Sequence, residues 1–153
     1  MFQKAHPLLF RRDKQALVPP NFCVAAQRTY RDAALLEQAQ RLANADHLYG
    51  LAAECALKAV LVGLGVIPSA GPPPRDRWRK HIDQLWAEYV AYVSGTLHRG
   101  YLVASVNPFQ DWEAGHRYEE DALFTPSRLT VHAAGALSAG LILEQAILDG
   151  VVT

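Results

Sequence analysis

Four stretches of the chain carry apolar residues at the spacing of an α-helix. They cover about residues 22–43, 45–64, 79–97 and 126–148. The first stretch lacks the alternation of charged and apolar residues that a half-buried strand requires. Asn44 is a candidate cap for the second helix, and a continuous first and second helix with a kink is the alternative. Thr125 and Pro126 are typical of the residues that open a helix.

The second stretch predicts a central helix, because it is apolar nearly all round between Leu48 and Val62. Gly63 and Gly65 mark its end. The last helix carries small residues four positions apart, on shared faces: Gly135, Ala136, Ala139 and Gly140. Small side chains let helices approach closely, so we expect the last helix to pack against the second.

The remaining segments are irregular. Residues 1–20 end in two prolines that block a helix, and residues 66–77 contain three consecutive prolines. Residues 98–125 predict a long loop that includes one short helix, and connections of this length are often functional. The sequence therefore predicts an all-α fold. We expect an irregular arm over 1–20 and one domain over 21–153, an up-and-down bundle of four to five helices.

Composition excludes some classes of protein. The chain has 153 residues and a formal net charge of zero, so it lacks the overall basic footprint of a nucleic-acid-binding domain. The best candidate for a local basic patch is the segment with Arg75, Arg77, Arg79, Lys80 and His81. The two cysteines, Cys23 and Cys55, lack the spacing of a zinc site, and Cys55 lies in an apolar run where it serves as a small hydrophobe.

The chain has no run of 18 apolar residues free of charge, and the apolar patch near residue 8 is too short for a signal sequence. The run from Leu48 to Leu64 comes closest to a membrane span, but Glu54 and Lys58 interrupt it. We therefore expect a cytoplasmic protein without a membrane segment.

Polar residues form one stripe along the second helix. His47, Gly50, Glu54 and Lys58 follow each other at steps of three, four and four residues. Glu54 and Lys58 form an i, i+4 pair in the favoured order. A structural ion pair or a solvent edge would explain the stripe, and the functional alternative is that it lines a binding site or a dimer interface.

Arg128 and His132 share a face near the start of the last helix, where a cation gains nothing from the helix dipole. Two basic side chains at the start of a helix could bind a phosphate group. The alternative is two solvated side chains on an exposed face.

The segment from Asn107 to Tyr118 mixes aromatic, acidic and basic residues. A base could stack on Trp112 or Tyr118 while Arg117 holds a phosphate. Alternatively, Phe109, Trp112 and Tyr118 pin the loop onto the bundle.

Several functional motifs are missing. The sequence has no phosphate-cradling glycine motif, no His-Glu-x-x-His and no nucleophile elbow. The acidic residues between Asp111 and Asp121 lack partners at helical spacing. We therefore expect neither a metal site nor a cofactor.

The stretch from Asn44 to Ala59 resembles the second helix of the HEPN superfamily, a run of small residues with Glu and Lys. Lys80-His81-Ile82 at the start of the third helix and Arg117-Tyr118 before the last helix also resemble HEPN sequences. The resemblance covers roughly residues 28–148 and rests mainly on the second helix. It implies a HEPN-like bundle, commonly a homodimer. It also implies a metal-independent endoribonuclease of a bacterial toxin–antitoxin or defence system, or a non-catalytic partner of a nucleotidyltransferase.

Catalytic members of the superfamily carry an Arg, four to six residues and then a His near the start of a late helix. Only three residues separate Arg128 from His132, whereas Arg41 to His47 and Arg75 to His81 have the family spacing elsewhere in the bundle. In such a site, His would transfer a proton and Arg would stabilise phosphoryl oxygens. The resemblance and the polar patterns together predict two sets of site residues. The catalytic set is Arg128, His132, His116 and Arg117, and the binding set is Glu54, Lys58, Trp112, Tyr118 and His47.

The leading hypothesis is an RNA- or nucleotide-linked role. A non-enzymatic module that binds a partner protein through the polar stripe or the aromatic loop is the second. A small-molecule pocket lined by Glu54, Lys58 and Tyr118 is the third.

Overall fold

The computed structural model describes residues 19–71, 73–74 and 77–153, which form four α-helices and three short 3-10 helices. The α-helices are α1 (Phe22–Gln38), α2 (Leu42–Gly63), α3 (Ile82–Ser94) and α4 (Pro126–Leu148), and the 3-10 helices are η1 (Arg99–Tyr101), η2 (Ala114–Tyr118) and η3 (Asp121–Leu123). The described residues contain no β-strand, so the all-α prediction is confirmed. The predicted arm over 1–20 lies almost entirely outside the described residues.

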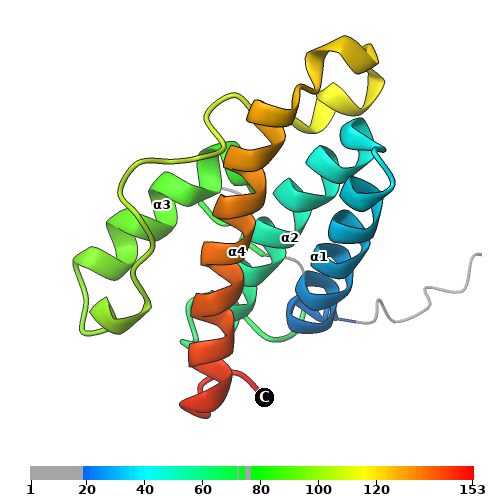
Figure 1. Cartoon of the computed structure of the whole chain (residues 1–153). Coiled ribbons are helices and arrows are strands. Elements are labelled where there is room, and N and C mark those ends of the chain that lie inside the picture. The colour runs from blue at the N-terminus through cyan, green and yellow to red at the C-terminus, as the bar shows by residue number, and fades with distance from the viewer. Residues whose placement is uncertain (1–18, 72, 75–76) are drawn as a thin grey trace, which may run out of the picture.

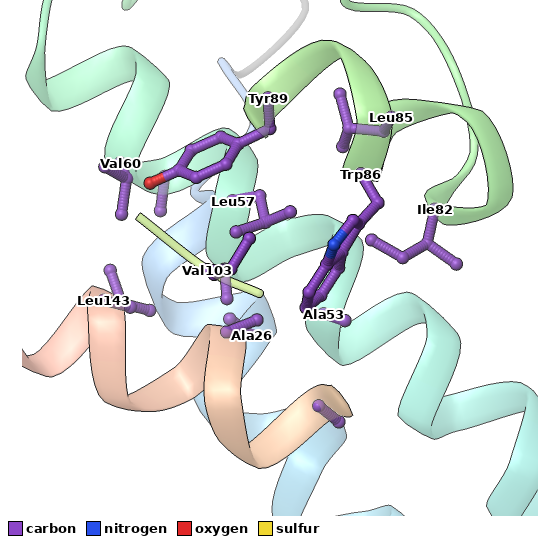
Figure 2. Close-up of a cluster of buried hydrophobic side chains, with 14 of the residues drawn as sticks. Ala26, Ala53, Leu57, Val60, Ile82, Leu85, Trp86, Tyr89, Val103 and Leu143 are labelled. Atoms are coloured by element: carbon purple, nitrogen blue, oxygen red, sulfur yellow. The ribbon is translucent and has the colours of Figure 1, made fainter. Parts of the chain in front are cut away.

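Helix α2 is the central element (Figure 1). It packs most extensively against α1, then against α4, and it also contacts α3, η2 and η3. Both the central position of α2 and its packing against α4 follow the sequence prediction. The interior is continuous: Leu57 and Val60 of α2 lie beside Leu85, Trp86 and Tyr89 of α3 (Figure 2).

The turn between α1 and α2 differs from the prediction in its position. The chain leaves the helix at Gln40, which has a φ of 58°, and α2 then begins at Leu42 rather than after Asn44. The amide of Arg41 donates to the carbonyl of Leu36 at 2.8 Å, and the amide of Gln40 donates to that of Glu37 at 2.9 Å. This is a Schellman ending with a glutamine at the left-handed position that glycine usually occupies. It ends α1 five residues before the predicted boundary, and the alternative of one kinked helix is wrong.

The small residues of α4 meet three different surfaces. Ala136 and Ala139 are buried in the core. Gly135 faces the long connection instead, because a Cβ there would lie 2.6 Å from the ring of Pro108 and 2.8 Å from that of Phe109. Gly140 has open space and borders a groove of about 290 Å³ between α1 and α4. The expectation that all four let α2 approach is therefore wrong for Gly135 and Gly140.

Side chains of α3 fasten the first part of the long connection. Trp86 donates to the carbonyl of Ala104 at 2.8 Å and Tyr89 to that of Tyr101 at 2.8 Å, so both bonds satisfy backbone carbonyls of the connection. In the other direction, the side chain of Asn107 in the connection donates to the carbonyl of Asp83 in α3 at 2.7 Å. The connection also contains three short 3-10 helices, η1, η2 and η3, where the sequence predicted one short helix.

By length and composition α4 could cross a membrane, which the sequence analysis did not expect of this segment. One third of its most apolar window (33%) is buried inside the domain, and the core helix of a soluble protein passes the same test. Its buried residues pack against α2 as in a soluble helical domain.

Candidate functional site

The second part of the long connection meets the start of α4 and the first half of α2 in a charged cluster, in which Asp46 and His132 are buried and the side chain of Asp111 is 63% exposed. Asp46, on the inner face of α2, accepts a hydrogen bond from Nδ1 of His132 at 2.5 Å. On the other side of the ring, Nε2 of His132 donates to Asp111 at 2.9 Å. Both His132 and Asp46 are buried, and the ring of Phe109 stacks on the imidazole at 5.2 Å. The cluster thus joins three segments that are far apart in the sequence.

Arg128 completes the charge balance of this cluster. Its guanidinium donates to the Asp111 carboxylate at 3.0 Å and to the Asp111 carbonyl at 2.6 Å, and its Nε lies 3.6 Å from the Asp46 carboxylate. Two carboxylates therefore face one guanidinium and one imidazole. Burial alone would raise the pKa of Asp111, but the hydrogen bond from His132 and the charges of His132 and Arg128 lower it overall.

The protonation of the two histidines follows from their partners. Carboxylates only accept hydrogen bonds, so with Asp46 and Asp111 ionised both nitrogens of His132 carry a proton. Nδ1 of His116, by contrast, accepts from the amide of Glu113 at 3.3 Å and from Arg128 at 3.1 Å. His116 is therefore a neutral imidazole with its proton on Nε2.

This arrangement restricts what the predicted catalytic pair can do. The side chain of His132 has no exposed surface and both its nitrogens are engaged, so it cannot accept a proton from a substrate in this conformation. Arg128 and His132 do share a face, but that face points inward, and the alternative of two solvated residues is wrong. Three of the four residues named as a catalytic set lie close together, since His116 contacts Arg128 and both Arg128 and His132 contact Asp111, whereas Arg117 lies at the surface beside Tyr118.

Trp112 lies in a notch of α2. A Cβ at Gly50 would come within 2.2 Å of the indole, and the indole N–H donates to the carbonyl of Asp46 at 3.2 Å. Trp112 is completely buried, so the prediction that a base stacks on it is wrong. Together with Phe109, it pins the loop onto the bundle.

Two histidines flank this indole. The ring of His47 stacks on Trp112 with centroids 5.6 Å apart, and the ring of His81 meets it edge-on at 6.3 Å. His47 is half-buried, and its Nδ1 has no hydrogen-bond partner among the described residues. Burial, followed by the charge of Arg117, lowers the pKa of His47 below its ordinary value of 6.5. His47 is therefore neutral at physiological pH.

The predicted pair Glu54 and Lys58 forms a buried ion pair at 2.6 Å. The other carboxylate oxygen of Glu54 lies 3.1 Å from Nδ1 of His81. Tyr118 does not join them, because it is 80% exposed, so the pocket predicted from these three side chains is not formed. Tyr118 instead lies under the guanidinium of Arg117, 5.0 Å from its ring centre, and both side chains are open to solvent.

The basic patch is partly neutralised. Arg77 and Lys80 both donate to Glu88, at 3.1 and 2.7 Å, and Arg79 donates to the carbonyl of Pro73 at 3.2 Å. Arg75 lies outside the described residues. The hydrogen bond from Lys80 is the main cause of the lowered pKa of Glu88.

Sequence patterns identified neither the two carboxylates, Asp46 and Asp111, nor the contact of His81 with Glu54. Asp46 did carry a signal, since it is an acidic residue on the inner face of a helix predicted to be central. Asp111 carried none, because its partners lie 17 and 21 positions away on another element. The two cysteines are free, and burial raises the pKa of Cys55 to about 11, as suits a small apolar side chain. The described residues hold no group of three or more His, Cys, Asp or Glu side chains arranged to bind a metal ion.

Comparison with known proteins gives no relative: no family model, no curated protein and no solved structure matches the chain.

Proposed function

We propose that this chain is a HEPN-like domain of the bacterial cytoplasm with an RNA- or nucleotide-linked role in a toxin–antitoxin or defence system. One observation carries the proposal. The segment with Arg117 and Tyr118 is held against the polar stripe of α2 and the start of α4, the three regions from which the site was predicted.

The exposed pair Arg117 and Tyr118 suits a single-stranded nucleic acid. An aromatic ring that is 80% exposed offers a face to an unpaired base, and the neighbouring guanidinium can pair with a phosphate. The buried charges around Asp46 and His132 fix the segment that presents them. We place the predicted catalytic cluster of Arg128, His132 and His116 in this supporting role.

Binding of a fluorescent single-stranded RNA of mixed sequence, measured by anisotropy in EDTA, tests the proposal. Loss of one stacked base in Tyr118→Ala should weaken binding about 5- to 150-fold, the equivalent of ~1–3 kcal/mol. Tyr118→Phe should bind like the wild type. Arg117→Ala removes the guanidinium that we expect to pair with a phosphate. Its matched control is Arg31→Ala, which removes an exposed arginine on α1. Wild-type protein that does not bind RNA or nucleotides would refute the proposal.

A second candidate function is the non-catalytic interaction module. It is supported by the hydrogen bonds that engage both ring nitrogens of His132, because neither Arg128 nor His132 then offers a free nitrogen that could accept a proton. The partner would be a nucleotidyltransferase encoded nearby. A stable complex on co-expression, together with absence of RNA binding, would favour this candidate over the first.

We also propose that the chain forms a homodimer. The outer side of α4 exposes three leucines that share one stripe at steps of four and seven residues, namely Leu137, Leu141 and Leu148. A second copy would cover them. Light scattering after gel filtration should give twice the chain mass of 16.9 kDa, and Leu141→Glu should give the single mass. A wild-type monomer at high concentration would refute this assembly.

A further inference from the structure

The carboxylate of Asp111 lies between two cations that are otherwise shielded from water. The side chain of Arg128 is 10% exposed and that of His132 is completely buried, whereas the side chain of Asp111 is 63% exposed. One oxygen of this carboxylate accepts from Nε2 of His132 at 2.9 Å, and the other accepts from the guanidinium of Arg128 at 3.0 Å. Asp111 therefore occupies the mouth of a cationic site whose two donors meet at the surface.

The two donors are held in place by other groups. Asp46, which is buried, accepts from Nδ1 of His132 on the inner side of the ring. The guanidinium of Arg128 is fixed by the backbone carbonyl of Asp111 at 2.6 Å and by Nδ1 of His116 at 3.1 Å. None of these contacts involves the carboxylate of Asp111. The donors can therefore keep their geometry when that carboxylate leaves.

Arg128 also has a donor that is not used. Its Nε is buried, lies 3.6 Å from the carboxylate of Asp46 and has no hydrogen-bond partner among the described residues. The two oxygens of Asp111 are already engaged by His132 and Arg128. A phosphate group has more acceptor oxygens than a carboxylate, so it suits a guanidinium with an unused donor.

The backbone of this segment is fastened without the help of the Asp111 carboxylate. Trp112, the next residue, is completely buried against Gly50, and the side chain of Asn107 donates to the carbonyl of Asp83 at 2.7 Å. Exposed side chains change rotamer on the picosecond to nanosecond timescale. The side chain of Asp111 can thus turn into water by rotation about its own bonds, while the segment stays docked.

The charge balance then calls for another anion. With Asp111 in place, two carboxylates balance the guanidinium of Arg128 and the imidazolium of His132. When Asp111 turns away, only Asp46 remains, and one positive charge in a nearly closed site is left without a partner, which is costly. Either an external anion restores the balance, or His132 gives up the proton on Nε2.

We propose that Asp111 makes an autoinhibitory contact: its carboxylate occupies a phosphate site formed by Arg128 and His132, and an external phosphate group binds there when this side chain turns into water. The inference rests on the proposed function, because that function supplies the phosphate as part of an RNA or a nucleotide. It adds the regulation of the site. It also explains why a basic pair with the predicted shared face is closed in the structure.

Titration of the full chain with inorganic phosphate, at neutral pH and constant ionic strength, tests this contact. The side-chain 15N signals of His132 and the melting temperature both report binding. In Asp111→Ala, phosphate should bind saturably and roughly tenfold or more tightly than in the wild type, because no internal carboxylate competes at high effective concentration. Asp149→Ala is the matched control. It removes an exposed carboxylate that accepts from Tyr101 and Gln145, and it should bind phosphate like the wild type.

Two further variants keep the test decisive. Asp111→Ser removes the same charge and should give the same result if Asp111→Ala does not fold. Addition of Arg128→Gln to Asp111→Ala should abolish phosphate binding, since the site loses one of its two cations. The proposal is overturned if phosphate binds Asp111→Ala no better than Asp149→Ala while the spectrum shows that His132 has lost its Nε2 proton. The carboxylate would then be a structural partner only.

RNA binding separates this inference from the function on which it rests. Asp111→Ala should bind the fluorescent single-stranded RNA more tightly than Asp149→Ala, and its affinity should depend more steeply on salt, by about one phosphate contact. Phosphate binding gained in Asp111→Ala, in a protein that binds neither RNA nor nucleotides, would support the site and overturn the proposed function. RNA binding by the wild type, without phosphate binding in either Asp111 variant, would overturn the inference and leave the function standing.

Discussion

Because Gly50 lies in close contact with Trp112, we expect one added methyl group at this position to destabilise the fold. In the interior of a helix, replacement of glycine by alanine normally stabilises the fold by about 1 kcal/mol. At Gly50 the added Cβ would lie 2.2, 2.3 and 2.6 Å from Cε2, Nε1 and Cζ2 of the indole. Gly50→Ala should therefore displace a completely buried side chain.

The magnitude follows from two costs and one gain. Overpacking a well-filled core costs about 1–3 kcal/mol. Loss of the hydrogen bond from the indole to Asp46 leaves a buried group without a partner, at about 1–3 kcal/mol. After the gain in helix propensity is subtracted, we expect a net destabilisation of about 1–5 kcal/mol. For a chain of this length, the melting temperature should fall by roughly 2–20 °C.

Gly140 provides the matched control, since it is also a helical glycine but has nothing within 4 Å of its added Cβ. Gly140→Ala should be neutral or stabilising, by up to about 1 kcal/mol. Urea unfolding followed by far-UV circular dichroism would compare both variants with the wild type. The reasoning fails if Gly50→Ala is as stable as the wild type, or if both variants lose stability equally.

Three further predictions concern charged groups. The pKa of Asp111 lies below its ordinary value of 3.8, so the stability that this carboxylate provides is present above that pH and is lost as the pH falls below about 4. Below about pH 4, the stability of Asp111→Asn should therefore fall less steeply with decreasing pH than the stability of the wild type. The same pH dependence in both proteins would contradict this. An NMR titration of His47 should give a midpoint below 6.5, and Arg117→Gln should raise it, because one cause of the lowered pKa is removed. A midpoint that stays fixed would show that the charge of Arg117 does not reach His47. His132→Leu leaves the buried carboxylate of Asp46 without its hydrogen-bonded cation and should cost about 3–5 kcal/mol in urea unfolding, whereas a loss below 1 kcal/mol would argue against the charge network.

The helix boundaries show which part of the fold a sequence can reveal. Gly65 and Gly150 adopt φ values of 74° and 72° after α2 and α4, and glycine is the residue that marks such endings. Gln40 has the same conformation after α1 with a side chain that fits a helix interior equally well. The pattern therefore continues through the turn, and only the packing of α1 on α2 decides where the first helix ends.

The candidate site was predictable as far as it depends on helical periodicity. The spacing of Glu54 and Lys58 predicted their ion pair, and the spacing of Arg128 and His132 predicted that they share a face of α4. Periodicity does not say which element covers a face. The burial of Trp112 and the pairing of His132 with Asp46 depend on how a long irregular segment docks, and no local pattern encodes that docking.

The bond between Asp46 and His132 joins residues 86 positions apart, which has a consequence for synthesis on the ribosome. Helices α1 and α2 can pair as soon as both have emerged, because only a three-residue turn separates them. The segment with Arg117 and Tyr118 can dock only after α4 has left the exit tunnel, because Asp111 in this segment pairs with Arg128 and His132 of α4. The hairpin of α1 and α2 can thus form before the segment from Asn107 to Tyr118 has its docking surface, and that surface is complete only when α4 docks.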